Sequence, residues 1–339
     1  MPTNKSSITQ SNHPPSSPVD ITFGDELISK QNNITRLLYH NTGSLGLSNN
    51  SHNLEVICDA MFTHDIDIAS LVETNTHWKH NNSIPRLKQV IKKFWSRINI
   101  STSETITSWS SIYKPGGTVT ITTSNIASTV VDSGEDKEGL GRWSYVTYGG
   151  KNKTKVTIVS AYRTCKPNDN QGVSPAHSQQ WDILEERQQE HENIREKMII
   201  DLIDFVQSLS DSAHEIIVCI DANEAFIPGK SGTARLIELT NLIDPLINKF
   251  GIQGEPPTYQ GGSYRIDFLL CTPNIEKYIV RIGILPIHEI SPSAHRGFIL
   301  DVHLREYLND LDHIPQSNNR LLSTQSPDST LIYLSLIHI

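Results

Sequence analysis

An acidic motif that follows a buried strand is the clearest chemical signal in this chain. Residues 216–220 form a continuous apolar run with β-branched side chains, which predicts a buried strand, and Asp221-Ala222-Asn223-Glu224 follows directly. A rigid strand end can hold a carboxylate and an amide in place against a metal-bound phosphate. Many strands also end in Asp to begin a turn, so this motif alone does not establish a site.

Other polar side chains accompany predicted strands in the same way. Four of them lie at the end of, or inside, a short apolar run of the kind that forms strands, and the fifth, His295, lies in Ser293-Ala294-His295-Arg296-Gly297. These residues are Asn41, Glu73, Tyr162, Asp267 and His295. We expect them to belong to the same site as Asp221 and Asn223.

Taken in chain order, these residues resemble the endonuclease/exonuclease/phosphatase superfamily, which has the DNase I-like fold. The resemblance covers residues from about 34 to 304; each motif is short, and their order is more specific than any one of them. Local phrases are similar to the endonuclease domains of non-LTR retrotransposons and their free-standing relatives, and fit the small-molecule phosphatase and sphingomyelinase branches less well. The phrases are Tyr113-Lys114-Pro115-Gly116-Gly117, Gly141-Arg142-Trp143, Ala161-Tyr162-Arg163, Asp221-Ala222-Asn223-Glu224, Pro257-Thr258-Tyr259 and His295-Arg296-Gly297.

The resemblance implies an α/β fold. The expected architecture is a four-layer sandwich of two mixed β-sheets flanked by helices, with the site at one end. Strand and helix signals alternate from residue 34 onward, as an α/β layered sandwich requires. The local patterns predict a helix around residues 54–61, a strand over 118–123 and one long helix from about 178 to 209.

Composition divides the chain into three predicted segments. Residues 1–32 are rich in Ser, Asn, Pro and Gln and predict a disordered leader. Residues 33–306 form the expected endonuclease/exonuclease/phosphatase domain, and residues 307–339 form a polar tail. The apolar end, residues 332–339, is typical of a translated cloning sequence or a frameshifted end. Retrotransposon proteins continue into a reverse transcriptase, so we expect a fragment or a free-standing nuclease.

Charge and cysteine usage narrow the class of protein. A formal net charge of −8 argues against a general polyanion binder, although basic groups in one groove suffice for a nuclease. The cysteines are far apart with no C-x-x-C pair, which argues against a zinc site or a disulfide scaffold. The chain shows no apolar signal segment and no run near the ~20 residues that cross a bilayer. We expect an intracellular monomer, nuclear or cytoplasmic, that is not secreted and has no membrane partner.

The resemblance implies a role for each site residue in phosphodiester hydrolysis. Glu73 is the expected main ligand of Mg²⁺, with Mn²⁺ as the alternative ion, and Asn41 beside it orients the metal shell or the phosphate. His295 contacts the scissile phosphate, as a general base or as a protonated stabiliser of developing charge. Asp267 holds the other ring nitrogen of that histidine.

The remaining predicted residues contact the water or the phosphate. Asp221 orients or deprotonates the attacking water, and Asn223 and Tyr162 donate hydrogen bonds to phosphate oxygens. Arg163 is a candidate for binding a flanking phosphate, although a solvated surface arginine fits the sequence equally well. Glu224 is expected to begin a turn or to pair with an arginine rather than to bind the metal.

One position departs from the family pattern. The usual Ser-Asp-His is Ser293-Ala294-His295 here, and the loss of a carboxylate should weaken metal binding and lower activity. The main interpretation is a Mg²⁺-dependent DNA endonuclease that nicks one strand and leaves a 3′-hydroxyl. The alternatives are a catalytically impaired relative that only binds nucleic acid or protein, and another phosphoesterase of this fold, such as an RNA nuclease or a phosphoinositide phosphatase. Loops around the site set substrate choice, so the sequence does not decide between them.

Overall fold

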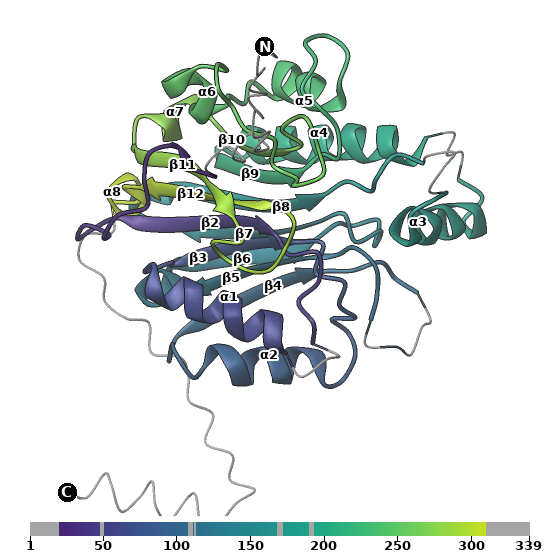
Figure 1. The fold of residues 1–339 in the computed structure, drawn as a ribbon, viewed down its shortest axis with the longest axis horizontal. Helices are drawn as coiled ribbons and strands as arrows, with labels where there is room; N and C mark the ends of the chain where they lie inside the picture. The colour runs from purple at the N-terminus through teal and green to yellow at the C-terminus, as the bar shows by residue number, and fades with distance from the viewer. Residues whose placement is uncertain are drawn as a thin grey trace, which may run out of the picture.

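Two β-sheets pack face to face between layers of helices (Figure 1). The predicted α/β four-layer sandwich is therefore confirmed. This is a computed structural model, and it describes residues 20–47, 51–107, 111, 113–167, 172–189 and 193–309. Within those ranges, no helix combines the length and the apolar character that crossing a membrane requires.

The larger sheet has seven strands and is mixed. They are β1 (Phe23–Gly24), β2 (Thr35–Asn41), β3 (Ile68–Val72), β4 (Ile98–Ser103), β5 (Thr118–Thr123), β11 (Ile279–Ile287) and β12 (Arg296–Val302). Their spatial order is β1-β11-β12-β2-β3-β5-β4, with β2 and β3 parallel and the other pairs antiparallel. The strand predicted over residues 118–123 is confirmed as β5.

The smaller sheet has five strands in the order β10-β9-β8-β7-β6. They are β6 (Val130–Glu135), β7 (Trp143–Gly149), β8 (Lys155–Tyr162), β9 (Glu215–Asp221) and β10 (Asp267–Cys271). Strands β8 and β9 are parallel, whereas β10 is antiparallel to β9. The register places Asp221 opposite both Tyr162 and Asp267, so three predicted site residues are neighbours across adjacent strands.

Helices lie around the two sheets. They are α1 (His52–Thr63), α2 (Ser83–Ile91), α3 (Pro175–Glu186), α4 (Ile194–Asp211), α5 (Gly232–Thr240), α6 (Pro245–Phe250), α7 (Pro273–Glu276) and α8 (Leu304–Tyr307), with short 3₁₀ helices η1 (Asn125–Thr129) and η2 (Lys151–Lys153). Figure 1 shows α1 and α2 on one side of the sandwich and α4 and α5 on the other. The helix predicted around residues 54–61 is confirmed as α1.

The alternation of side chains along the strands leads from the core to the site. Tyr39 of β2 and Cys219 of β9 lie in the buried core between the two sheets, whereas Leu38 packs in a separate core under α1 and α2. Because side chains on a strand alternate with a period of two, Asn41 and Asp221 continue the inward faces of their strands. The site therefore closes one end of the space between the sheets.

The single long helix predicted over residues 178–209 is wrong. The structure has two helices there, α3 and α4, and Gln188 between them has a left-handed backbone with φ of 54°. The side chain of Asn193 accepts a hydrogen bond from the N–H of Glu196 at 3.0 Å, which is an N-cap and starts a new helix. Ile194, Met198, Leu202 and Leu209 form a buried face along α4, and the capping asparagine marks the beginning of this helix.

The folded part begins before the predicted boundary at residue 33. Phe23 and Gly24 form β1, which pairs with β11, and the N–H of Ile282 donates to Oδ2 of Asp25 at 2.9 Å. Residues 20–32 thus pack against the domain instead of belonging to a disordered leader. Residues 1–19 and the predicted tail from residue 310 onward lie outside the described residues.

Candidate functional site

The predicted site residues meet where several strands end or begin. Parallel strands bring their last residues to a common edge, and antiparallel neighbours bring their first residues to that same edge. Asn41, Tyr162 and Asp221 are the last residues of β2, β8 and β9; Glu73 follows β3; Asp267 begins β10; and His295 directly precedes β12. Strand direction therefore explains how residues from the whole length of the chain come together.

Asn41 lies between two carboxylates. Its Nδ2 donates to Oε2 of Glu73 at 2.9 Å and to Oδ2 of Asp221 at 2.7 Å, while its Oδ1 accepts from the N–H of Gly43 at 2.9 Å. One amide thus joins an acid of the larger sheet to an acid of the smaller sheet. Because its nitrogen faces the acids, Asn41 orients them; its oxygen is already engaged with the backbone.

Glu73, Asp221 and His295 form a cluster that can hold a cation. Each offers one potential ligand atom, and these atoms all lie within 4.8 Å of one another. Burial raises the pKa of Glu73; burial together with the Asp267 carboxylate raises the pKa of Asp221 well above its ordinary range. A positive charge between them would oppose both shifts, because it favours the ionised carboxylates. The oxygen-rich donor set fits a hard divalent cation such as Mg²⁺ or Mn²⁺.

His295 is oriented by a buried acid. Its Nδ1 lies 3.0 Å from Oδ2 of Asp267, and Oη of Tyr39 donates to Oδ1 of the same carboxylate at 2.7 Å. Burial opposes protonation of His295, but the charges of Asp267, Asp221 and Glu73 outweigh it and raise its pKa to about 9. An imidazole held in this way can carry a proton or stabilise negative charge that develops on a phosphate.

Tyr162 and Asn223 flank the acids as hydrogen-bond donors. Burial and the nearby Glu73 carboxylate raise the pKa of Tyr162 well above its ordinary value, so its hydroxyl stays protonated. The N–H of Asn223 donates to Oδ1 of Asp221 at 2.8 Å, and its Nδ2 donates to the carbonyl of Arg163 at 2.7 Å. An amide nitrogen carries two hydrogens, so this contact does not exhaust its capacity to bind a ligand.

Arg163 does not lie on the surface. Its side chain is buried, with 5% of the residue exposed, and its Nη1 pairs with Oε2 of Glu224 at 2.7 Å. Its Nε donates to the carbonyl of Arg195 at 3.0 Å. Arg163 was expected either to bind a flanking phosphate or to be a solvated surface arginine. Its guanidinium is instead buried and neutralised by Glu224. Glu224 pairs with an arginine, as expected, but that arginine lies in the interior.

Three residues that support the site were not predicted. They are Tyr39, Thr258 and Ser293, all buried. Ser293 Oγ donates to the carbonyl of Asn41 at 2.6 Å and accepts from the N–H of His295 at 3.2 Å; Thr258 Oγ1 accepts from the first N–H of β10 at 3.1 Å. Tyr39 could have been found from the sequence, because it lies two residues before Asn41 and therefore on the same inward face of the strand. Thr258 and Ser293 lie in loops, and their signal was the resemblance carried by Pro257-Thr258-Tyr259 and Ser293-Ala294-His295.

Two residues at the rim of the site are Tyr259, which is aromatic, and Ala294, which replaces an acid of the resembled family. Tyr259 is 41% exposed, and its ring centroid lies 5.1 Å from that of His295, so it offers a flat apolar surface beside the imidazole. Ala294, at the position where the resembled family carries an acid, is half-buried, and its carbonyl accepts from the N–H of Gln260 at 2.8 Å. Position 294 therefore adds no carboxylate to the cluster.

Comparisons with known proteins identify the fold. No protein-family model and no curated protein sequence matches this chain. Among solved structures, the AP endonuclease LMAP from Leishmania major matches with a TM-score of 0.57 and 15% identity, covering 79% of this chain and 87% of that one. An AP endonuclease from Archaeoglobus fulgidus matches at 0.54 and 13%, covering 78% and 98%. The human Nocturnin catalytic domain matches at 0.53 and 15%, covering 81% and 94%. At these identities the likeness shows the fold, which is the DNase I-like α/β sandwich.

Proposed function

We propose that this chain is a metal-dependent phosphodiesterase, and more specifically a DNA endonuclease that nicks one strand. The observation that carries the proposal is the convergence of Glu73, Asp221 and His295, whose potential ligand atoms all lie within 4.8 Å of one another. Similar folds occur in two AP endonucleases, which agrees with a nucleic-acid substrate. The phrases similar to retrotransposon endonucleases favour DNA and a retrotransposon-type enzyme.

The acids of the site suit a hard cation. Glu73 is the residue that would hold Mg²⁺ or Mn²⁺, with Asn41 orienting its carboxylate at 2.9 Å. When bound, such an ion neutralises charge on the phosphate and on the leaving oxygen. The protein itself positions the two carboxylates, because the side-chain amide of Asn41 donates hydrogen bonds to both Glu73 and Asp221.

The remaining groups act on the phosphate and the water. Asp221 orients the attacking water and accepts its proton, because its carboxylate lies in the cluster with Glu73 and His295. Tyr162 and Asn223 donate hydrogen bonds to phosphate oxygens. His295, oriented by Asp267, stabilises the negative charge that develops on the phosphate.

The test is nicking of supercoiled plasmid by the purified protein, with Mg²⁺ and with a chelator. We expect nicking that requires Mg²⁺, leaves 3′-hydroxyl ends, and is lost in both Glu73→Gln and His295→Ala. The matched controls are Glu55→Gln, at an exposed position on α1, and His303→Ala, which follows the far end of β12; both should nick like the starting protein.

The negative outcomes separate the alternatives. A folded protein that never nicks but still binds DNA would overturn the endonuclease proposal in favour of a binding relative. A panel of DNA, RNA and inositol phosphates identifies the substrate class, and hydrolysis of RNA or inositol phosphate alone would replace DNA in the proposal. Nicking that survives Glu73→Gln would show that the reaction occurs elsewhere.

A further inference from the structure

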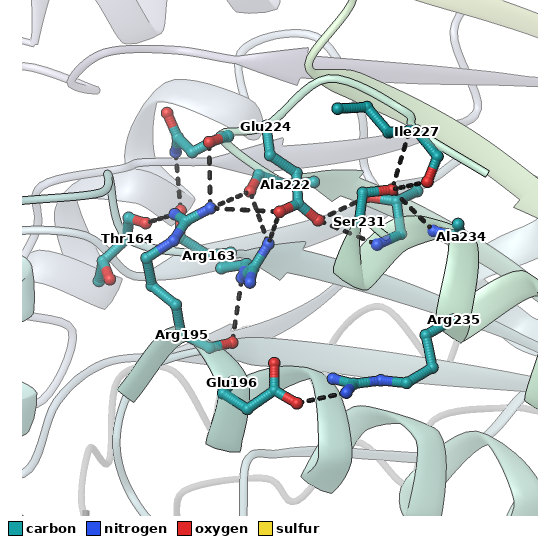
Figure 2. Close-up of polar contacts among 12 residues, drawn as sticks. Arg163, Thr164, Arg195, Glu196, Ala222, Glu224, Ile227, Ser231, Ala234 and Arg235 are labelled. Carbon is teal, nitrogen blue, oxygen red and sulfur yellow. Dashed lines mark hydrogen bonds and ion pairs between the residues drawn. The ribbon is translucent and has the colours of Figure 1, made fainter. Parts of the chain in front are cut away.

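Two buried arginines and one glutamate lie beneath the turn that follows β9. We call Arg163, Arg195 and Glu224 the arginine–glutamate cluster. Arg195 lies in the first turn of α4, and both arginines are less than one-tenth exposed. Figure 2 shows the two guanidinium groups directed toward the Glu224 carboxylate and toward neighbouring carbonyl groups. The site residue Asp221 ends β9, and Asn223 lies in the turn that these groups support.

Arg195 connects the ends of two strands. Its Nη1 donates to the carbonyl of Thr164, just after β8. Its Nη2 donates to the carbonyls of Asn223 at 3.1 Å and Ala222 at 3.3 Å, just after β9. One planar guanidinium therefore holds the carbonyls of two separate segments, which the single ammonium group of a lysine cannot reproduce.

Glu224 holds the two guanidinium groups in place. Its Oε2 lies 2.7 Å from Nη1 of Arg163 and 3.7 Å from Nη2 of Arg195. Its Oε1 accepts from the N–H of Thr233, in the first turn of α5, at 3.0 Å. A carboxylate is favoured at a helix N-terminus, so α5 fixes Glu224 and Glu224 fixes the arginines.

Several contacts hold the turn at Asn223. This residue has a left-handed backbone with φ of 47°, a conformation that asparagine adopts more readily than most other non-glycine residues. Its carbonyl is held by Arg195, its side chain by the carbonyl of Arg163, and its N–H by Asp221. Each of these contacts limits where the amide and the Asp221 carboxylate can point.

We infer that the arginine–glutamate cluster is a positioning device, which aligns Asp221 and Asn223 for the reaction and acts on turnover rather than on substrate binding. This inference rests on the proposed phosphodiesterase function. None of its three residues touches the substrate; Arg163 and Arg195 act through the carbonyls they hold. The cluster carries a net positive charge, because two guanidinium groups face one carboxylate. This charge lies beside the site proposed to bind the phosphate and favours the negative charge that develops there.

Two conservative variants test the inference. Arg195→Lys keeps the positive charge but loses the planar fork, and Glu224→Gln keeps the shape but loses the negative charge. The matched control is Glu196→Gln: Glu196 pairs with Arg235, and that pair also links α4 to α5 but is half-exposed and lies apart from the turn (Figure 2). We expect both test variants to lower kcat by about 10- to 100-fold with KM within about twofold, and the control to match the starting protein.

A second measurement does not depend on activity. Hydrogen–deuterium exchange of the peptide spanning residues 216–227 should be faster in Arg195→Lys and Glu224→Gln than in the starting protein or in Glu196→Gln. Unchanged exchange in both variants would overturn the inference. So would a wild-type kcat, even with a lowered melting temperature, because it would assign the cluster to stability alone.

The two readouts separate failure of the inference from failure of the proposed function. If the starting protein does not nick, the proposed function fails, and exchange still decides whether the cluster holds the turn. If Arg195→Lys does not fold, Glu224→Gln decides alone, because it is nearly isosteric. A raised KM with unchanged kcat would place the cluster in substrate binding and overturn its positioning role.

Discussion

Tyr39 of the larger sheet donates a hydrogen bond to Asp267 of the smaller sheet, with Oη and Oδ1 2.7 Å apart. The other oxygen of Asp267 lies 3.0 Å from Nδ1 of His295. Burial, followed by the charge of Asp267, raises the pKa of Tyr39, which keeps its hydroxyl protonated as a donor. The orientation of the histidine is thus set from inside the core, across the interface between the two sheets.

Replacing Tyr39 by Phe should slow the reaction without removing any group from the site. The ring remains, but Asp267 loses a buried donor and becomes free to shift relative to His295. Hydrogen bonds to charged groups contribute ~1.5–3 kcal/mol, so we expect kcat to fall about tenfold with little change in KM. Steady-state nicking rates in Mg²⁺ measure the effect.

The control for this variant is Tyr148→Phe. Tyr148 is equally buried between the sheets, and its Oη lies 2.6 Å from Oγ1 of Thr122, away from the site residues. It should lose stability but keep its kcat. Equal losses of kcat in both variants would show that the effect of Tyr39 is general loosening of the interface.

Much of the site could be predicted because it follows the period of the strands. Asn41, Tyr162 and Asp221 occupy inward-facing positions at strand ends, and an apolar run followed by a polar residue is visible in sequence. The four-layer fold was implied by the family resemblance that the order of these residues carries. Local pattern and global fold agree at these positions, which is why sequence reasoning works there.

The remaining features of the site depend on long-range contacts, which local sequence patterns do not predict. Arg163 looks like an exposed arginine next to a site tyrosine, and its burial follows only from the packing of Glu224 and Arg195 around it. Ser293 belongs to the Ser293-Ala294-His295 motif, but the motif does not show that the loop before β12 returns beside Asn41, whose carbonyl accepts a hydrogen bond from Ser293 Oγ. Such long-range pairs are decided by tertiary packing, and a single sequence shows neither partner.

A hydroxyl network in the core should make a measurable contribution to stability. Ser160 Oγ lies 2.7 Å from Oγ of Ser70 and 2.7 Å from Oγ1 of Thr120, and all three residues are fully buried between the sheets. Ser160→Ala removes the partner that the Ser70 and Thr120 hydroxyls share, while the Ser70 hydroxyl keeps its contact with Cys219. We expect the free energy of unfolding to fall by ~1–3 kcal/mol, measured by urea denaturation.

Removing the whole network tests whether unpaired hydroxyls cause that loss. The triple variant Ser70→Ala, Thr120→Val, Ser160→Ala has no polar group left to desolvate, so it should be no less stable than Ser160→Ala alone. A triple variant that loses stability in additive steps would show that packing, and not hydrogen bonding, dominates at these positions.

His40 should make the protein sensitive to mild acid. It is fully buried, with Nε2 2.8 Å from Oγ of Ser291, and burial lowers its pKa to about 4. In the unfolded chain a histidine has a pKa of ~6.5, so below that pH the unfolded chain binds a proton at His40 that the folded protein does not bind. The contribution of His40 to the free energy of unfolding is therefore fully present above pH ~6.5 and is lost as the pH falls toward 4. Between pH 7 and pH 5 this amounts to about 2 kcal/mol.

The variant His40→Gln isolates this contribution. It cannot take up the proton, so its free energy of unfolding should fall less between pH 7 and pH 5 than that of the starting protein, while other titrating groups affect both alike. Urea denaturation at the two pH values gives the difference. Parallel losses in the two proteins would show that His40 is not the group responsible.

Restoring an acid at position 294 should strengthen the metal site. Ala294 lies between Ser293, which holds the backbone of Asn41, and His295, which contributes to the cation cluster. A carboxylate added there raises the local negative charge, so Ala294→Asp should lower the Mg²⁺ concentration needed for half-maximal nicking, by roughly tenfold, and raise kcat. The control Ala294→Asn has similar size without the charge and should require as much Mg²⁺ as the starting protein. If both variants respond alike, the side chain at this position acts on the loop before β12 and not on the ion.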